Sequence, residues 1–389
     1  MNRFFIRIFL ILLISFNLFS IVPIFYGARS LSLGFSSSAF NYDVNSIFIN
    51  PAILSELQIP VGAYQFESGN FAYKNFYDDL SSLTLDNIKN YSQLSEDLKG
   101  EISDNLRNIF GSKFGMYGFQ ANIPGFVVKR YGFSVSFFSL TIINPISNSL
   151  TDKKVSVLSQ DEINNLKFNV IGLKYRQYSV AYGVDLSKSM SLGVTVHYLN
   201  GKVGISDRSV TDDFFYNGYS EKEYSQNGWA EPKQNFGKFI ADVSINSRVG
   251  KFFNFAVIVK NISNPTIETD FRELEIKERF IVSLAFRPEN KFGLYFDLDL
   301  KKKDLLFSGN EIQPVSIGVE KIFFNGKFTV RGGILSDLTE HYIFGKRSNI
   351  LYGLGLGVNT GNFLVDAGIG LGNDGKLRSI AISGFYIIK

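Results

Sequence analysis

Few residues in the sequence are suited to metal or nucleophilic chemistry. The chain has no cysteine, which excludes disulfides, thiolate metal sites, iron–sulfur clusters and cysteine nucleophiles. Its only histidines are His197 and His341. A transition-metal centre or a His-based catalytic triad would therefore have almost no suitable side chains. We therefore expect no metal, no cofactor, no catalytic residue and no enzyme activity.

The polar residues that remain lie in segments where apolar and polar residues alternate. His197 falls on the polar face of residues 192–198, where we expect a hydrogen-bonded rather than a catalytic side chain. The glycines of residues 353–357 alternate with leucines, and no strand-to-helix junction surrounds them. They therefore indicate one face of a strand and not a phosphate-binding loop.

The charged residues of these segments also lie on the polar face. Asp297, Asp299 and Asp366 fall on the inner faces of such segments, where we expect structural ion-pair networks. The basic partners that we consider are Lys174, Arg176, Arg287 and Arg331. Over the whole chain, 40 Lys and Arg oppose 36 Asp and Glu without a basic face or tail, so nucleic-acid binding is not indicated.

The elements that must position these residues are β-strands. From residue 112 to the C-terminus, apolar residues recur at every second position, which predicts about 14 strands. One or two more strands are expected within residues 59–77. Runs of ~10 residues are long enough to cross a bilayer at a tilt, whereas the strands of a soluble β-sandwich are usually ~5–6 residues long. Long polar connections alternate with tight turns, as in an outer-membrane barrel.

The N-terminus predicts export. Two arginines within the first seven residues precede an apolar run over residues 8–25, which is typical of a signal peptide. We assign residues 1–27 to it, with cleavage between Ser20 and Ala28; an uncleaved membrane anchor is the alternative. Together with the strands, this predicts an all-β fold, a transmembrane antiparallel barrel in the bacterial outer membrane.

Residues 78–110 differ from the rest, because their apolar residues recur every three to five positions. This spacing predicts one or two amphipathic helices with a break near Gly100, inserted between strands.

Residues 27–54 read GARSLSLGFSSSAFNYDVNSIFINPAIL. This stretch resembles the opening of FadL-type outer-membrane transporters and their PorV-like relatives, which have Gly-Ala-Arg, a Leu-Gly step, Ala-Phe, Asp-x-Asn and then Asn-Pro-Ala before Leu. One departure is Ser36-Ser37-Ser38, where a glycine is usual. The resemblance implies a barrel of about 14 strands, formed by residues 58–389, with residues 28–57 folded into its lumen as a hatch. The candidate hatch and gating residues are Asp43, Asn45, Asn50, Pro51 and Ala52.

By resemblance, the function would be passive uptake of hydrophobic small molecules such as long-chain fatty acids. The implied partners are outer-membrane lipid and the hydrophobic ligand. The alternative is a PorV-like structural or interaction barrel that serves a protein partner in export or envelope assembly. A transporter should have an apolar path that ends near Asn50, whereas an interaction barrel should have a plugged lumen and a broad loop surface.

Overall fold

The computed structural model describes residues 27–40, 45–57, 61–71, 83–111, 115–146, 157–210, 233–270, 273–289, 291–304, 311–339 and 350–387. Residues 1–26 of the expected signal peptide, His341 and Asp43 lie outside the described residues, whereas Gly27 lies within them.

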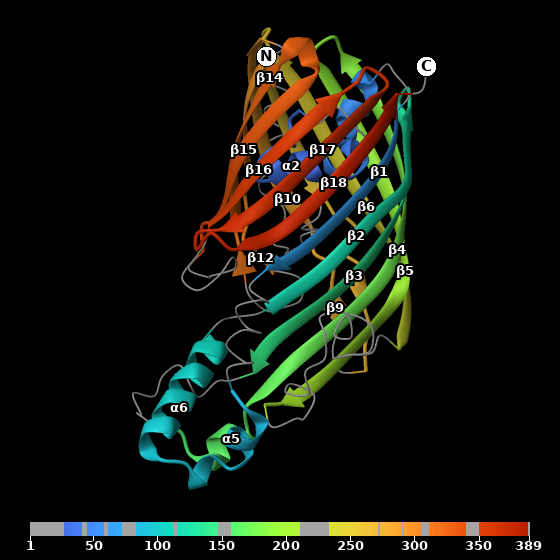
Figure 1. Cartoon of the computed structure of the whole chain (residues 1–389). Helices are drawn as coiled ribbons and strands as arrows, with labels where there is room; N and C mark the ends of the chain where they lie inside the picture. Colours follow the sequence, from blue (N-terminus) through green and yellow to red (C-terminus); the bar gives the residue numbers. More distant parts are fainter. Residues whose placement is uncertain are drawn as a thin grey trace.

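The described strands form a closed antiparallel barrel of 14 strands (Figure 1). They are β1 (Val61–Phe71), β2 (Gly115–Val128), β3 (Tyr131–Ile146), β4 (Lys167–Ser187), β5 (Met190–Ser209), β6 (Gln234–Val249), β7 (Phe253–Lys260), β10 (Arg279–Glu289), β11 (Phe292–Asp299), β14 (Pro314–Phe323), β15 (Phe328–Asp337), β16 (Ile350–Asn359), β17 (Phe363–Gly372) and β18 (Leu377–Ile387). The ring closes where β1 pairs with β18.

The number of barrel strands agrees with the expected barrel, but their positions along the sequence differ from the expected ones. Thirteen of these strands follow residue 112, and β1 completes the ring. Short strands outside the ring pair as two ribbons, β8 (Thr266–Ile267) with β9 (Leu274–Glu275) and β12 (Lys303–Asp304) with β13 (Glu311–Ile312). The alternation of apolar and polar residues predicts that these residues are extended. It does not distinguish a ribbon in a loop from a strand of the barrel wall.

The barrel wall is asymmetric. Strands β2 to β6 have 14 to 21 residues, whereas the other barrel strands have 8 to 11. One side therefore extends well beyond the other at the end with the long connections, as the green strands in Figure 1 show. At the opposite end lie tight turns, where Gly250, Gly326 and Gly361 adopt positive φ. This arrangement confirms the predicted alternation of tight turns and long connections.

The two faces of the wall differ as the alternation predicts. On β11, Gly293, Tyr295, Asp297 and Asp299 are buried and face inward, whereas Leu294 is exposed on the outside. Across the barrel the exposed large apolar side chains lie on this outer face, which is the surface that lipid covers in a transmembrane barrel.

The expected helical insertion is present, but the interruption between its helices is not at the expected position. It consists of α5 (Leu85–Lys89), η2 (Tyr91–Gln93) and α6 (Glu96–Gly111), and α7 (Gln160–Asn164) packs beside them. Helix α6 runs through Gly100, so the expected break there is wrong; the interruption lies at η2 instead. A single glycine costs a helix only ~1 kcal/mol, which the buried apolar face of α6 offsets. None of the described helices is long and apolar enough to cross a membrane.

Candidate functional site

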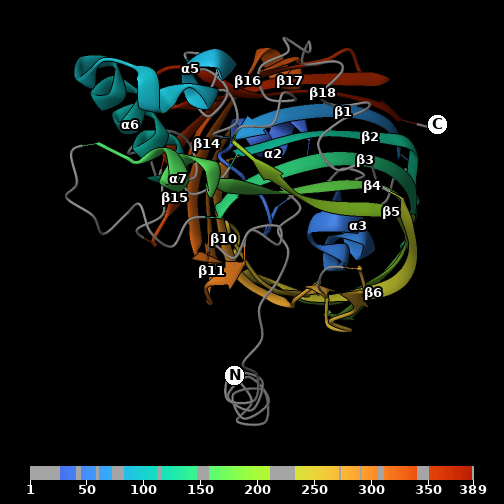
Figure 2. The ribbon, with the colours of Figure 1, turned by 90° about the horizontal axis from the view of Figure 1, so that it is seen from below.

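A segment of the N-terminal region fills the barrel. Residues 27–40 and 45–57 carry α2 (Ala28–Ser32), α3 (Ser46–Ile49) and η1 (Pro51–Glu56), and most of their side chains are buried. Figure 2 looks along the barrel and shows α2 and α3 inside the ring of strands. Helix α2 packs against β15 to β18, whereas η1 packs against β4 to β6. We call these residues the lumenal segment.

Buried charges hold the first half of the lumenal segment. Arg29 Nε donates to Glu320 Oε2 at 3.3 Å, and Arg331 Nε donates to the same oxygen at 2.7 Å. Arg331 also reaches Asp366 at 2.5 Å, which is one of the ion pairs that the sequence left open. Arg287 instead places its guanidinium 3.9 Å from the centroid of the Phe40 ring, a cation–π contact with the lumenal segment.

The Asn-Pro-Ala step joins the two halves. Asn50 is fully buried, and its Nδ2 donates to the carbonyl oxygen of Ser38 at 2.8 Å. Its Oδ1 accepts from the Ala52 N–H, which also donates to Ser244 Oγ at 2.9 Å on the wall. Asn50 has a non-helical backbone with φ −152° and ψ 89°, and Pro51 starts η1. The structure thus brings Asn50, Pro51 and Ala52 together, with Asn45 buried before α3.

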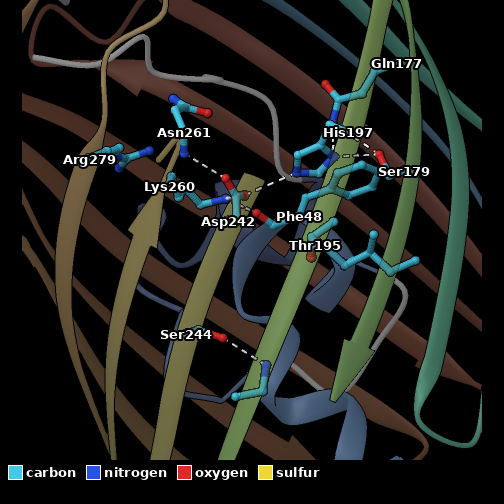
Figure 3. A network of polar contacts seen from close by, with 12 residues as sticks. Phe48, Gln177, Ser179, Thr195, His197, Asp242, Ser244, Lys260, Asn261 and Arg279 are labelled. Atoms are coloured by element: carbon cyan, nitrogen blue, oxygen red, sulfur yellow. Dashed lines mark hydrogen bonds and ion pairs between the residues drawn. The ribbon is translucent and has the colours of Figure 1, made fainter. Parts of the chain in front are cut away.

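A polar network on β4 to β7 holds the second half (Figure 3). His197 Nδ1 lies 2.8 Å from Ser179 Oγ, and His197 Nε2 lies 3.2 Å from Asp242 Oδ2. Lys260 Nζ lies 3.2 Å from the same carboxylate oxygen and donates to the carbonyl oxygen of Phe48 in α3. The Phe48 ring stacks on the His197 imidazole at a centroid distance of 6.1 Å. The expected hydrogen-bonded histidine is therefore confirmed, in contact with the lumenal segment.

Glycines on the inner wall make room for the lumenal segment. A Cβ on Gly193 would lie 2.0 Å from the Ala52 backbone nitrogen, and one on Gly355 would lie 1.8 Å from Ser32 Oγ. Two of the alternating glycines of β16, Gly353 and Gly355, thus lie where α2 touches the wall, whereas Gly357 lies beside Asp366 and Arg331. Such glycines allow backbone to approach backbone closely.

A small charged cavity lies beside the lumenal segment. Phe35 and Ile49 of the segment line it together with Lys260, Arg279 and Asp297 of the wall. Asp297 accepts from Ser283 Oγ and from the Ser38 N–H, and Asp299 pairs with Arg279 at 3.0 Å. In this cavity the lumenal segment therefore lies beside wall residues of both positive and negative charge.

Toward the long connections, the inner wall becomes apolar. A buried cluster joins inward-facing residues of β3 to β6 to the ribbon β8–β9 and neighbouring residues; it includes Leu140, Leu173, Leu199, Phe236, Ile240, Ile267 and Leu274. The Phe138 and Tyr175 rings stack beside it with centroids 4.5 Å apart. We call this region the apolar inner zone. It borders the lumenal segment at Phe35 and Leu31.

Two expected basic partners face outward, and two cations that face inward were not singled out from the sequence. Lys174 and Arg176 are exposed on the outer face of β4, because this strand of 21 residues extends beyond the part of the wall where outward residues must be apolar. Lys260 and Arg279 take the inner positions instead. The signal for Lys260 is its alternation with Asn254, Ala256 and Ile258 on the inner face of β7.

No protein-family model matches the chain, and no curated protein matches it in sequence. Solved structures do match. A Pseudomonas aeruginosa FadL homologue is 10% identical, with 95% of this chain and 100% of that chain covered and a TM-score of 0.52. The Ralstonia pickettii toluene transporter TbuX is 11% identical over 94% of this chain and 98% of its own, with a TM-score of 0.52. The P. putida toluene transporter TodX is 10% identical over 93% and 98%, with a TM-score of 0.53.

The chain has the fold of the FadL-type outer-membrane channels. The matches cover 93 to 95% of the chain. At this identity the likeness concerns the fold, so the role of individual residues in a FadL-type barrel must be argued from their contacts.

Proposed function

We propose that this protein is an outer-membrane channel for passive uptake of hydrophobic small molecules, with residues 28–57 as its hatch. The observation that carries the proposal is the apolar inner zone, which ends at the lumenal segment beside Phe35 and Ile49, next to Asn50, as expected for a transporter; the plugged half is what the interaction-barrel alternative expects. The zone also packs the ribbon β8–β9 on the wall, and we propose that a ligand enters between the ribbon and the wall. The polar contacts described above are the chemistry of a holding and gating device, and we propose no catalytic role for them.

The proposed path starts at the long connections. A hydrophobic molecule leaves water for the apolar inner zone, because burial of apolar surface is favourable by roughly 25 cal/mol per Å². It then meets the lumenal segment at Phe35 and the charged cavity. Further passage requires the segment to move, so the segment must have a second arrangement within a few kcal/mol of the first.

The charged cavity offers two cations to a ligand with an anionic head, beside the carboxylates of Asp297 and Asp299. Lys260 and Arg279 lie at the end of the apolar inner zone, where the carboxylate of a long-chain fatty acid would arrive with its chain behind it. The matching structures named above include transporters of toluene, an uncharged molecule. We propose long-chain fatty acids as the ligand class because an uncharged aromatic would leave these cations without a role in recognition.

The hatch proposal rests on how the segment is held. Irregular backbone at membrane depth is tolerated where protein or water surrounds it, and small Ser and Gly residues pack in a narrow lumen. Asn50 links both halves of the segment, so a displacement of one half would be felt by the other. We propose Asn50, Pro51 and Ala52 as gating residues, with Asn45 and, outside the described residues, Asp43 as further candidates.

The test compares the wild type with a variant that lacks residues 30–42. Uptake of a labelled long-chain fatty acid and of labelled toluene would be measured in proteoliposomes, and conductance in planar bilayers. We expect fatty-acid uptake above an empty membrane, weaker toluene uptake, and a leaky barrel after the deletion. Both barrels should migrate differently on a gel with and without boiling. If the wild type transports neither compound and the deletion leaves conductance unchanged, the channel proposal fails and an interaction barrel takes its place.

A further inference from the structure

The outer face of β4 changes from apolar to basic along its length. The outward residues Leu186, Tyr182, Val180 and Tyr178 are exposed and apolar or aromatic. The next outward residues are Arg176 and Lys174, and both are exposed. On β5 the same change occurs after Val194 and Val196, where the exposed residues Asn200 and Lys202 follow Tyr198.

The change falls at the expected membrane boundary. Leu186 and Arg176 are ten residues apart, which is about 33 Å along a strand at ~3.3 Å per residue. A strand tilted by about 40° rises ~25 Å over that length, and the apolar band of an outer-membrane barrel is about 25 Å tall. Arg176 therefore lies at the edge of the band, on the side of the long connections, and Lys174 lies just beyond it. In barrels of this kind the long connections are on the outside of the cell.

Like charges meet in this part of the sheet. Lys174 and Lys202 are direct partners in the antiparallel register of β4 and β5. Like charges directly opposite each other destabilise a sheet, because their side chains leave the backbone ~5 Å apart. The Arg176 guanidinium lies 5.6 Å from the centroid of the outward Phe137 ring, which holds it against the wall. Within the part of the chain that the structure describes, none of the three cations forms an ion pair.

The helical insertion lies above the three cations. Phe168 and Val170 continue the outward face of β4, and they are buried against α5, α6 and α7 together with Ile143 of β3. Figure 2 shows α5 and α6 at one side of the ring of strands. The cations thus lie between the lipid-facing wall and a helical unit packed on the same outer face, at the level of lipid headgroups.

We propose that Lys174, Arg176 and Lys202 form a binding site for the phosphate group of an anionic lipid in the outer leaflet. A phosphate between Lys174 and Lys202 would offset their mutual repulsion, and a guanidinium can donate two parallel hydrogen bonds to phosphate oxygens. The acyl chains would then lie against Tyr178 and Phe137 in the apolar band. This site is on the opposite face of the wall from the lumenal segment, so it does not depend on the proposed transport function.

The test uses native mass spectrometry of the full barrel with defined lipids. The patch variant K174Q/R176Q/K202Q removes the three charges, and K251Q/K291Q/K327Q removes three exposed charges at the end with the tight turns as a matched control. Wild type and control should retain phosphatidylglycerol and bind phosphatidylcholine much more weakly, because its phosphate carries a compensating choline. The patch variant should bind phosphatidylglycerol roughly 100-fold more weakly, since each of the three cations near a membrane surface contributes about fivefold.

Three outcomes would overturn the proposal. The first is equal phosphatidylglycerol binding by the patch and control variants, and the second is equal binding of the two lipids by the wild type. The third is full competition by a few millimolar inorganic phosphate, which would make this a site for free phosphate and not for lipid. Unchanged heat-dependent gel migration of both variants would show that loss of binding does not come from misfolding.

Discussion

Lys260 of the barrel wall donates a hydrogen bond to the carbonyl oxygen of Phe48 in the lumenal segment, and its ammonium group also pairs with Asp242. One buried side chain therefore joins the wall, the second half of the segment and the cavity where a ligand head would arrive. A ligand carboxylate that drew this ammonium away would remove a contact that keeps α3 in place.

Replacing Lys260 with methionine should loosen the lumenal segment. A hydrogen bond from a charged donor contributes about 1.5–3 kcal/mol, so the open fraction should rise roughly tenfold or more. Single-channel conductance in planar bilayers measures this. Arg279→Met is the control, because it removes a charge from the same cavity but one that pairs with Asp299 on the wall. Equal effects of both changes would show that the charge of the cavity matters and the contact with Phe48 does not.

Asn50→Ala should accelerate fatty-acid uptake without a general leak. The change removes the hydrogen bonds to Ser38 and Ala52, at about 0.5–1.5 kcal/mol each, while Arg29 and Lys260 still hold the two halves. Asn50→Asp retains the acceptor for the Ala52 N–H and should have a smaller effect. Uptake of labelled fatty acid, with small-solute conductance in parallel, is the measurement. Unaltered uptake in both variants would remove Asn50 from the gate.

Gly193→Ala should displace η1, whereas Gly332→Ala should be nearly neutral. A Cβ at Gly193 would meet the Ala52 backbone nitrogen at 2.0 Å, but at Gly332 its nearest neighbour is Val319 Cγ1 at 3.9 Å. Since backbone cannot yield without moving the segment, we expect raised conductance in a barrel that still assembles. Wild-type conductance in the Gly193 variant would mean that the wall, and not the segment, gives way.

Leu354→Arg should destabilise the barrel in a bilayer, because Leu354 is half exposed on the outer face at the middle of β16. The expected cost is ~2–4 kcal/mol near the midplane, but ~0–1 kcal/mol for Phe324→Arg, which lies in a tight turn. Urea unfolding in lipid vesicles would measure both. Similar costs would place Leu354 outside the apolar band.

The mature protein should start between Ile21 and Gly27. Gly27 N–H donates to buried Glu67 at 2.8 Å, and Ala28 N–H donates to Ser383, so removal beyond Gly27 would cost contacts that hold the segment in place. Intact-mass measurement of membrane-extracted protein decides this. A mass that includes residues 1–20 would instead support a retained anchor.

The direction in which wall side chains point could be predicted, because it depends on residues that are neighbours in the sequence. Alternation alone places Asp366 and His197 inward and Leu294 outward, since successive side chains of a strand point to opposite faces. The contact of Lys260 with Phe48 was not predictable, because it joins residues 212 positions apart whose meeting depends on how the segment folds back. Arg176 was misplaced for a related reason: the sequence does not say where a strand leaves the membrane, so a charge there can face outward.

The pairing of β1 with β18 sets the order in which the molecule can be assembled. Val61 lies opposite Ile387, so the seam between β1 and β18 cannot form until the chain has been made as far as Ile387. Contacts between such distant residues form slowly, because a long loop must close before they are stabilised. The lumenal segment precedes β1 and lies inside the finished ring, so it has to be in position before the seam closes or pass through an end of the barrel afterwards. An open-sided intermediate with an accessible segment is therefore the species on which an assembly factor would act.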